Sequence, residues 1–85
     1  MKLKNDFITH DTGDEQIVID VSRKHFSGVI RSNETAAFIV DCLKSETTPD
    51  QIVEKLMAQY DAPREQIAAD VDRIIEKLRA VGALE

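Results

Sequence analysis

The fold of this chain is decided by residues 26–39, which read FSGVIRSNETAAFI. The β-branched pair Val29 and Ile30 favours a strand that ends at Ser32, and Asn33 is a preferred cap for the first turn of a helix. This stretch therefore predicts a strand that continues directly into a helix. A strand edge beside a helix is a surface on which another polypeptide can dock, so recognition rather than catalysis is our first hypothesis.

Upstream of this stretch, the sequence predicts a β-hairpin. Phe7–His10 and Gln16–Val21 are rich in β-branched residues, and the residues between them favour a turn. An apolar set alternates with a mixed set in the second strand, which predicts one buried face and one mixed face. The apolar set is Ile17, Ile19 and Val21, and the mixed set is Val18 and Asp20. The third strand spans Phe26–Arg31, and because consecutive strands usually lie side by side, we expect it at an edge of the sheet.

The second half of the chain predicts three helices. The first follows the Asn33 cap. The second has a complete start signal, in which the hydroxyl of Thr48 precedes Pro49 at the first helical position. The third begins near Pro63 and stops at Gly82, a residue type that commonly ends helices. Its broad apolar stripe consists of Ile67, Val71, Ile74, Ile75, Leu78 and Val81.

The order of these elements predicts an α+β fold. Strands within residues 7–31 form a three-stranded antiparallel β-sheet, and helices within residues 33–82 form a three-helix bundle. This outline is winged helix-turn-helix-like, with the wing placed first. A chain of 85 residues has the size of one domain, so we expect residues 1–85 to form a single domain.

The charge of the chain limits the partners that it can bind. The net charge is -5, and residues 33–85 hold 6 basic and 11 acidic residues, against 5 and 5 in residues 1–32. Binding to nucleic acid depends on Lys and Arg that neutralise phosphates, so the acidic helical half makes nucleic acid an unlikely partner. The chain begins without the apolar run of a signal peptide, and no stretch approaches the roughly 20 apolar residues of a membrane span. We therefore expect a cytoplasmic protein without membrane attachment.

Side chains that carry chemistry are few. Cys42 is the only cysteine, so it forms neither an intramolecular disulfide nor a zinc site with other cysteines, and we expect a small buried residue rather than a reactive thiol. His10 and His25 stand in separate segments without the spacing of metal ligands. No nucleophile stands in a pattern with a base and an orienting partner. We therefore expect no enzyme activity, no metal and no cofactor.

The stretch at residues 26–39 resembles the PqqD-like family, the relatives of pyrroloquinoline quinone synthesis protein D. The resemblance covers nearly the whole chain. Further matching positions are Thr48, Ile52, Leu56, Tyr60, Asp70, Val71 and Gly82–Leu84. Three positions depart from the family pattern: Ser32 replaces the usual leucine, Val40 the usual tryptophan, and Ser45 the glycine that commonly ends the first helix. These departures bear on which peptide is bound rather than on the fold.

The resemblance implies a non-catalytic peptide-binding protein, a peptide chaperone of ribosomal peptide biosynthesis. Such stand-alone recognition elements capture the leader segment of a ribosomally synthesised precursor peptide and present it to a modifying enzyme, often a radical S-adenosylmethionine enzyme. The leader adds as a strand beside the third strand and packs against the third helix. The implied peptide-binding residues are Val29, Ile30 and Arg31 on the strand, with Asp70, Arg73, Ile74 and Lys77 on the helix.

Several of these positions also have a purely structural interpretation. Ile74 belongs to the apolar stripe of the third helix and suits the core, in which case Val71 or Ile75 would face the peptide instead. Arg73 and Lys77 lie four residues apart and could be solvated, or could pair with the carboxylates of Asp70 and Glu76 at the surface. Periodicity alone leaves these alternatives open.

Two other classes of protein share some of these features. A winged-helix DNA-binding transcriptional regulator would have the same architecture, but the third helix alternates basic with acidic residues, which weakens that interpretation. An acyl or peptidyl carrier protein would be similarly small, acidic and helical. It needs a modifiable serine directly after an aspartate, and no Asp-Ser step occurs in the sequence.

Overall fold

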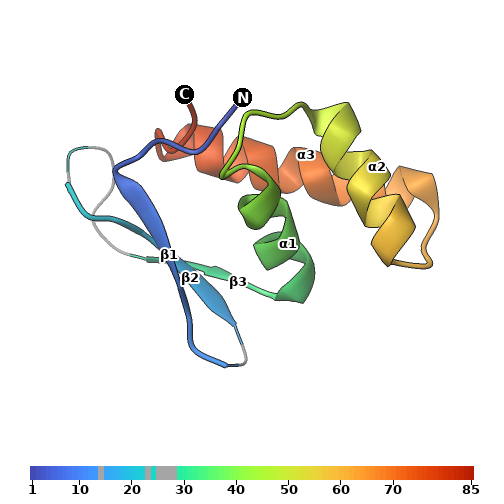
Figure 1. Cartoon of the computed structure of the whole chain (residues 1–85), viewed down its shortest axis with the longest axis horizontal. Coiled ribbons are helices and arrows are strands. Elements are labelled where there is room, and N and C mark those ends of the chain that lie inside the picture. Colours follow the sequence, from blue (N-terminus) through green and yellow to red (C-terminus); the bar gives the residue numbers. More distant parts are fainter. Residues whose placement is uncertain (14, 23, 25–28) are drawn as a thin grey trace.

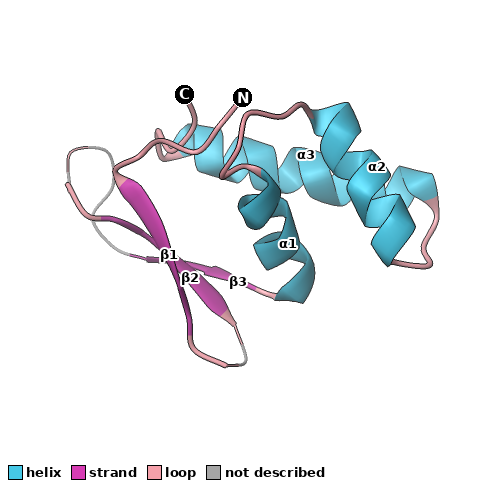
Figure 2. Cartoon of the chain, in the orientation of Figure 1, coloured by secondary structure: helices cyan, strands magenta, loops and turns pink. Residues whose placement is uncertain are grey.

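Strands and helices follow one another in the predicted order. The computed structural model describes residues 1–13, 15–22, 24 and 29–85. Its elements are β1 (Phe7–Asp11), β2 (Gln16–Asp20), β3 (Val29–Ser32), α1 (Glu34–Cys42), α2 (Pro49–Gln59) and α3 (Arg64–Ala80). Figure 2 shows the sheet on one side of the molecule and the helices on the other, which confirms the α+β prediction. His25 and the predicted start of the third strand, residues 26–28, lie outside the described residues.

The sheet is antiparallel, with β2 in the middle. Its strand order is β1-β2-β3, and the register places Ile19 opposite both Ile8 and Val29. Over the residues that the structure describes, β3 pairs with β2 alone, so its other side carries no strand of this chain. The prediction that the third strand lies at an edge is confirmed. β1 forms the opposite edge of the same sheet.

The buried face of β2 is the one with the mixed set of residues, so our interpretation of its alternation was wrong. Val18 and Asp20 are buried, whereas Ile17 and Ile19 are half-buried and Val21 is 57% exposed. A period of two fixes which residues share a face, but it does not fix which face meets the helices. Two further polar residues, Gln16 and Ser32, are also buried.

Hydrogen bonds supply the reason why polar residues occupy this inner face. The Gln16 Nε2 amide donates to Asp41 Oδ1 in α1 at 3.1 Å, which ties the sheet to the first helix. The carboxylate of Asp20 accepts hydrogen bonds from both the backbone N–H and the hydroxyl of Ser22, at 3.0 and 2.6 Å. Buried polar groups that keep such partners avoid most of the cost of leaving water.

The first two helices begin directly after the residues that cap them. The side-chain oxygen of Asn33 accepts from the Ala36 N–H at 2.9 Å, and the Thr48 hydroxyl accepts from the Gln51 N–H at 3.2 Å. Gly82 has φ 75°, a left-handed conformation that glycine adopts without steric cost, and it follows Val81, the residue that caps the end of α3. The apolar faces of the three helices meet in one core, whose largest fully buried side chains include Ile39, Leu43, Ile52, Leu56 and Leu78.

Both ends of the chain close over this core. Leu3 and Leu84 form an isolated antiparallel bridge, and the side chains of Leu3 and Ala83 are buried. The terminal ammonium of Met1 donates to Glu46 Oε1 at 2.9 Å. Figure 1 shows the two termini side by side above α3, and the N-terminal segment runs from there to the start of β1.

Candidate functional site

A cleft of about 260 Å³ separates the end of β3 from the exposed face of α3. The strand contributes Arg31, and the helix contributes Asp70, Arg73, Ile74 and Lys77. These five residues are all among the seven that the family resemblance implies for peptide binding. Residues of the β3–α1 junction complete the lining: Asn33, Thr35, Ala36 and Ile39.

Sequence reasoning did not assign the α1 side of this cleft. The sequence assigned Asn33 only as a helix cap. A helix that begins directly after an edge strand places its first turn beside that strand. This direct connection in the sequence is the signal from which the α1 residues could have been found. Ala36 and Ile39 are buried, so they form an apolar floor beneath the charged rim.

The remaining two predicted residues lie on β3 next to the cleft. Ile30 is buried in the core with 7% of its surface exposed, so its side chain packs inward against the helices. Its neighbour Val29 belongs to β3 and lies opposite Ile19 of β2. The side chain of Ile30 is therefore not available to a partner, and the hydrogen-bond ladder of the sheet shows which backbone groups of β3 point outward.

The hairpin hydrogen bonds show which residues of β2 bond to β1. The Val21 N–H donates to the Asp6 carbonyl, and the Thr12 N–H to the Glu15 carbonyl, each at 2.9 Å. Both pairs continue the β1–β2 register. In an antiparallel ladder, hydrogen-bonded pairs alternate with pairs that are not bonded. Two steps along the register from these pairs, Ile17 and Ile19 are therefore the residues of β2 that bond to β1.

It follows that the alternate residues of β2 bond to β3. Val18 lies opposite Ile30, and the neighbouring Gln16 lies opposite Ser32. The N–H and C=O of Ile30 thus point into the sheet, whereas those of Val29 and Arg31 point away from β2. This free edge presents a donor and an acceptor at each of these two residues, the arrangement to which an extended peptide adds as a further strand.

The rim of the cleft is cationic but partly neutralised. The Arg73 guanidinium lies 2.8 Å from Asp70, and Arg31 lies 3.2 Å from Glu15 at the hairpin turn. Lys77 is exposed and has no ion pair within the described part of the chain. Our sequence interpretation allowed Glu76 to pair within this rim, but its carboxylate lies 3.1 Å from Arg79 instead. The cleft therefore keeps one unpaired cation for a negatively charged guest.

The structure also resolves which isoleucine of α3 faces the cleft. Val71 and Ile75 are buried in the core, whereas Ile74 is half-buried and lines the cleft. Ile74 therefore provides the apolar wall opposite the Ala36 and Ile39 floor. This arrangement suits an apolar side chain of an extended peptide.

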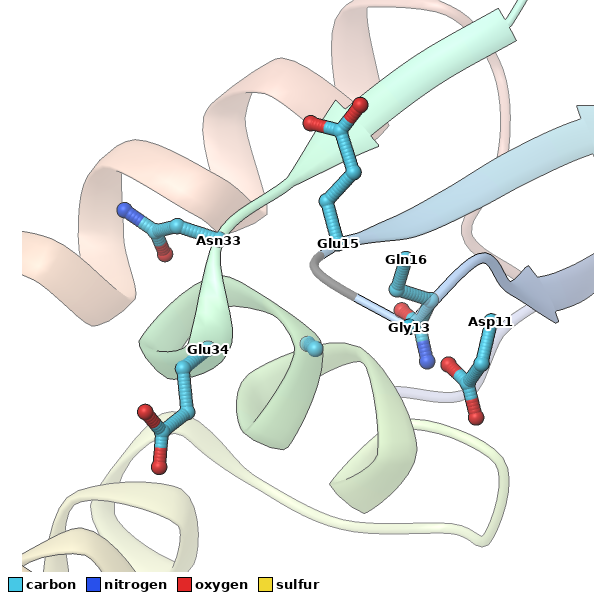
Figure 3. A pocket seen from close by; sticks show the side chains of 7 residues that line it. Asp11, Gly13, Glu15, Gln16, Asn33 and Glu34 are labelled. Carbon is cyan, nitrogen blue, oxygen red and sulfur yellow. The ribbon is translucent and has the colours of Figure 1, made fainter.

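A second hollow, of about 330 Å³, lies at the turn of the hairpin (Figure 3). Asp11, Glu15 and Glu34 line it, and Gly13 there has φ 102°. Figure 3 shows the carboxylates of Glu15 and Glu34 pointing away from each other, so the acidic groups do not converge on one point. No group of His, Cys, Asp and Glu among the described residues is arranged to hold a metal ion.

Cys42 is a free thiol at the border of the core. It is half-buried and packs against the core. Burial raises the pKa of its thiol above the ordinary 9.0, Lys55 lowers it and Asp41 raises it further. Because the thiolate is the reactive form, a raised pKa makes the thiol less reactive, as the sequence analysis expects.

Most of the chain matches the model of a known protein family. The family model of coenzyme PQQ synthesis protein D (PqqD) matches residues 15–84, a range that contains β2, β3 and all three helices. The comparison with curated proteins gave no match. None of the described helices is long and apolar enough to cross a membrane.

Two solved structures are similar in fold. TbiB1 in complex with the TbiA(beta) leader peptide superposes with a TM-score of 0.83 at 19% identity, over 100% of this chain and 95% of TbiB1. Lasso peptide synthetase B1 complexed with the leader peptide superposes with a TM-score of 0.77 at 21% identity, over 96% of this chain and 93% of the synthetase chain. At such identities the likeness establishes a shared fold.

The family match rests on most of the sequence rather than on the fold alone. It includes the stretch that joins β3 to α1 and the whole of α3, which are the two sides of the cleft. Proteins of this family are non-catalytic, in agreement with our prediction that the chain is not an enzyme. By the match of residues 15–84, the chain belongs to the PqqD family.

Proposed function

We propose that this protein captures the leader segment of a ribosomally synthesised precursor peptide and presents the peptide to a modifying enzyme. The leader adds as a fourth strand beside β3, and its alternate side chains enter the cleft against α3. The modifying enzyme is of the radical S-adenosylmethionine type, and the complex acts in the cytoplasm, where ribosomes make the precursor.

One observation carries this proposal: a free strand edge and a lined cleft lie side by side. Outward-pointing backbone groups at Val29 and Arg31 give affinity for any extended chain. The cleft adds selectivity, because Ile74 provides an apolar wall while Arg73 and Lys77 provide charge. The two structures of similar fold are each complexed with a leader peptide, which supports a peptide as the ligand here.

The DNA-binding alternative has less support from the charge distribution. A helix that enters the major groove needs free cations for the phosphates. On α3, Arg73 lies 2.8 Å from Asp70 and Arg79 lies 3.1 Å from Glu76. With a net charge of -5, the protein as a whole repels a polyanion.

Nuclear magnetic resonance tests the site directly. The isotope-labelled protein is titrated with the leader of a precursor peptide encoded beside its gene. We expect the largest amide shifts at Val29 and Arg31 and along the cleft side of α3 near Ile74. A duplex of random DNA at the same concentration is the control, and we expect it to leave these amides unchanged. Leader-induced shifts confined to α2 would contradict the proposed site.

The enzyme partner needs an experiment of its own. A radical S-adenosylmethionine enzyme encoded beside the gene is incubated with the precursor, with and without this protein. We expect the mass change of the modified peptide only when this protein is present. A precursor that is modified equally well without it would contradict the presenting role while leaving leader binding intact.

A further inference from the structure

We propose a second polypeptide-binding edge on β1, opposite the proposed leader site, which takes an acidic extended segment of a partner protein. A cleft of about 400 Å³ runs beside this strand. It lies between the N-terminal segment, the start of β1 and the end of α1. The residues that matter for the argument are Lys2, Lys4, Phe7, Ile8, Thr9 and Lys44.

Within the described part of the chain, β1 pairs with β2 alone, so its outer side can accept another strand. The Asp6–Val21 and Thr12–Glu15 bonds show that alternate residues between them, Ile8 included, bond to β2. The N–H and C=O of Thr9 therefore point away from the sheet, as do those of Asp11. Toward the start of the strand, the Phe7 N–H already donates to the Lys4 carbonyl at 3.0 Å, which closes that end of the edge. An added strand thus pairs with residues 9–11 and runs toward the lysines.

The charge of the cleft identifies the kind of segment that fits. Its described lining residues include three lysines and no carboxylate, in a protein whose net charge is -5. Lys44 lies 3.1 Å from Asp41, outside the cleft lining. Lys2 and Lys4 have no ion pair within the described part of the chain. Two unpaired cations beside a free strand edge select an acidic guest.

An apolar side chain of the guest also has a place to bind. Ile8 is 47% exposed, one of two large hydrophobic residues among the described residues with such exposure. It lies on the outer face of the sheet, next to the half-buried Ile19 in the β1–β2 register. A guest strand that alternates acidic and apolar residues therefore places one set toward the lysines and the other beside Ile8.

A second copy of this chain is a poorer occupant of the same edge. Pairing β1 with the β1 of another copy would bring two sets of the same three lysines toward one shared edge. Like charges that face each other across a new strand pair destabilise it. The leader edge on β3 is separate, because β2 lies between the two edges.

The test uses the wild-type protein and two short peptides of about eight residues, the length of an ordinary strand. One peptide alternates glutamate with valine, and the control peptide alternates lysine with valine. Amide shifts of the labelled protein locate each peptide. We expect the glutamate peptide to shift Thr9 and Asp11, and the lysine peptide to leave both unchanged. No shift with the glutamate peptide, shifts confined to β3 and α3, or equal shifts with both peptides would overturn the proposal.

A pair of charge-reversal variants tests the role of the lysines. In the first, Lys2→Glu and Lys4→Glu are combined; in the second, Lys55→Glu and Arg79→Glu make the same change in net charge away from the cleft. We expect the first variant to lower the affinity for the glutamate peptide at β1 by about tenfold, since each exposed ion pair contributes about threefold to affinity. Equal weakening in both variants would mean that only the overall charge matters, which would overturn the site. Sedimentation of the free protein measures its self-association. Self-association accompanied by a shift of the Thr9 amide signal would identify a second copy as the occupant and overturn the acidic partner.

Discussion

The Arg73 guanidinium donates to the Asp70 carboxylate at 2.8 Å across one turn of α3, at the rim of the cleft between β3 and α3. The Arg73 side chain is 71% exposed and that of Asp70 is 25% exposed. An exposed pair of this kind contributes at most about 1 kcal/mol, so an acidic residue of a bound peptide can compete for Arg73. Lys77, one turn further along the helix, is already unpaired within the described residues. Both cations of the rim are therefore available to an acidic residue of a bound peptide.

Reversing these two cations should weaken leader binding without unfolding the protein. We expect the combined Arg73→Glu and Lys77→Glu variant to lose about 1 to 2 kcal/mol of binding free energy, and less at high salt, because rim charges are screened. Calorimetric titration at two salt concentrations measures this loss. The matched control combines Arg64→Glu with Arg79→Glu, on the same helix but outside the cleft lining. An affinity for the leader that is unchanged at low salt would contradict the role of the rim.

Substitutions at two adjacent isoleucines of α3 should have different effects, one mainly on leader affinity and the other mainly on the free energy of unfolding. Ile75 is 4% exposed and part of the core, so Ile75→Ala should lower the free energy of unfolding by about 2 to 5 kcal/mol. Ile74 lines the cleft, so Ile74→Ala should cost less stability but reduce leader affinity. Urea denaturation and calorimetric titration of both variants check this. Equal effects of the two substitutions on affinity would mean that Ile74 is an ordinary core residue.

The thiol of Cys42 should react slowly near neutral pH. Burial is the main cause that raises its pKa above 9.0, and the Lys55 ammonium opposes this rise. The folded protein should therefore hold less thiolate at pH 8 than an unfolded control, and iodoacetamide should alkylate it more slowly. Lys55→Gln removes the opposing charge and should slow the reaction further. Faster alkylation in this variant would contradict the assigned causes.

Local signals were enough to predict the helices and their order. Asn33 and Thr48 cap α1 and α2 through side-chain hydrogen bonds, and such caps act within one turn of the chain. The bridge between Leu3 and Leu84 was not predicted, because neither residue carries a local signal and their contact joins opposite ends of the sequence. Long-range pairing of this kind depends on the packed core.

The candidate site could be predicted only in part from the sequence. The resemblance supplied Arg31, Asp70, Arg73 and Lys77, and the structure brings all four to one cleft. Only the structure shows whether Ile74 faces the core or the cleft. The apolar stripe of α3 is so wide that a residue within it can lie on either side. The face of β2 was predicted wrongly, because the partner of Gln16 is Asp41 in α1, and no local pattern reveals a contact between elements that far apart.

Proline scanning of β3 tests the central claim, that a leader peptide adds as a strand to this edge. Proline removes a backbone N–H, and the N–H of Arg31 points outward whereas that of Ile30 points into the sheet. Affinity for the leader and thermal midpoint are measured for Arg31→Pro and Ile30→Pro. The account predicts that Arg31→Pro loses affinity by at least the roughly 0.5 to 1.5 kcal/mol of one hydrogen bond and keeps its melting temperature, while Ile30→Pro melts earlier. Full affinity in Arg31→Pro, with the fold intact, would contradict the account.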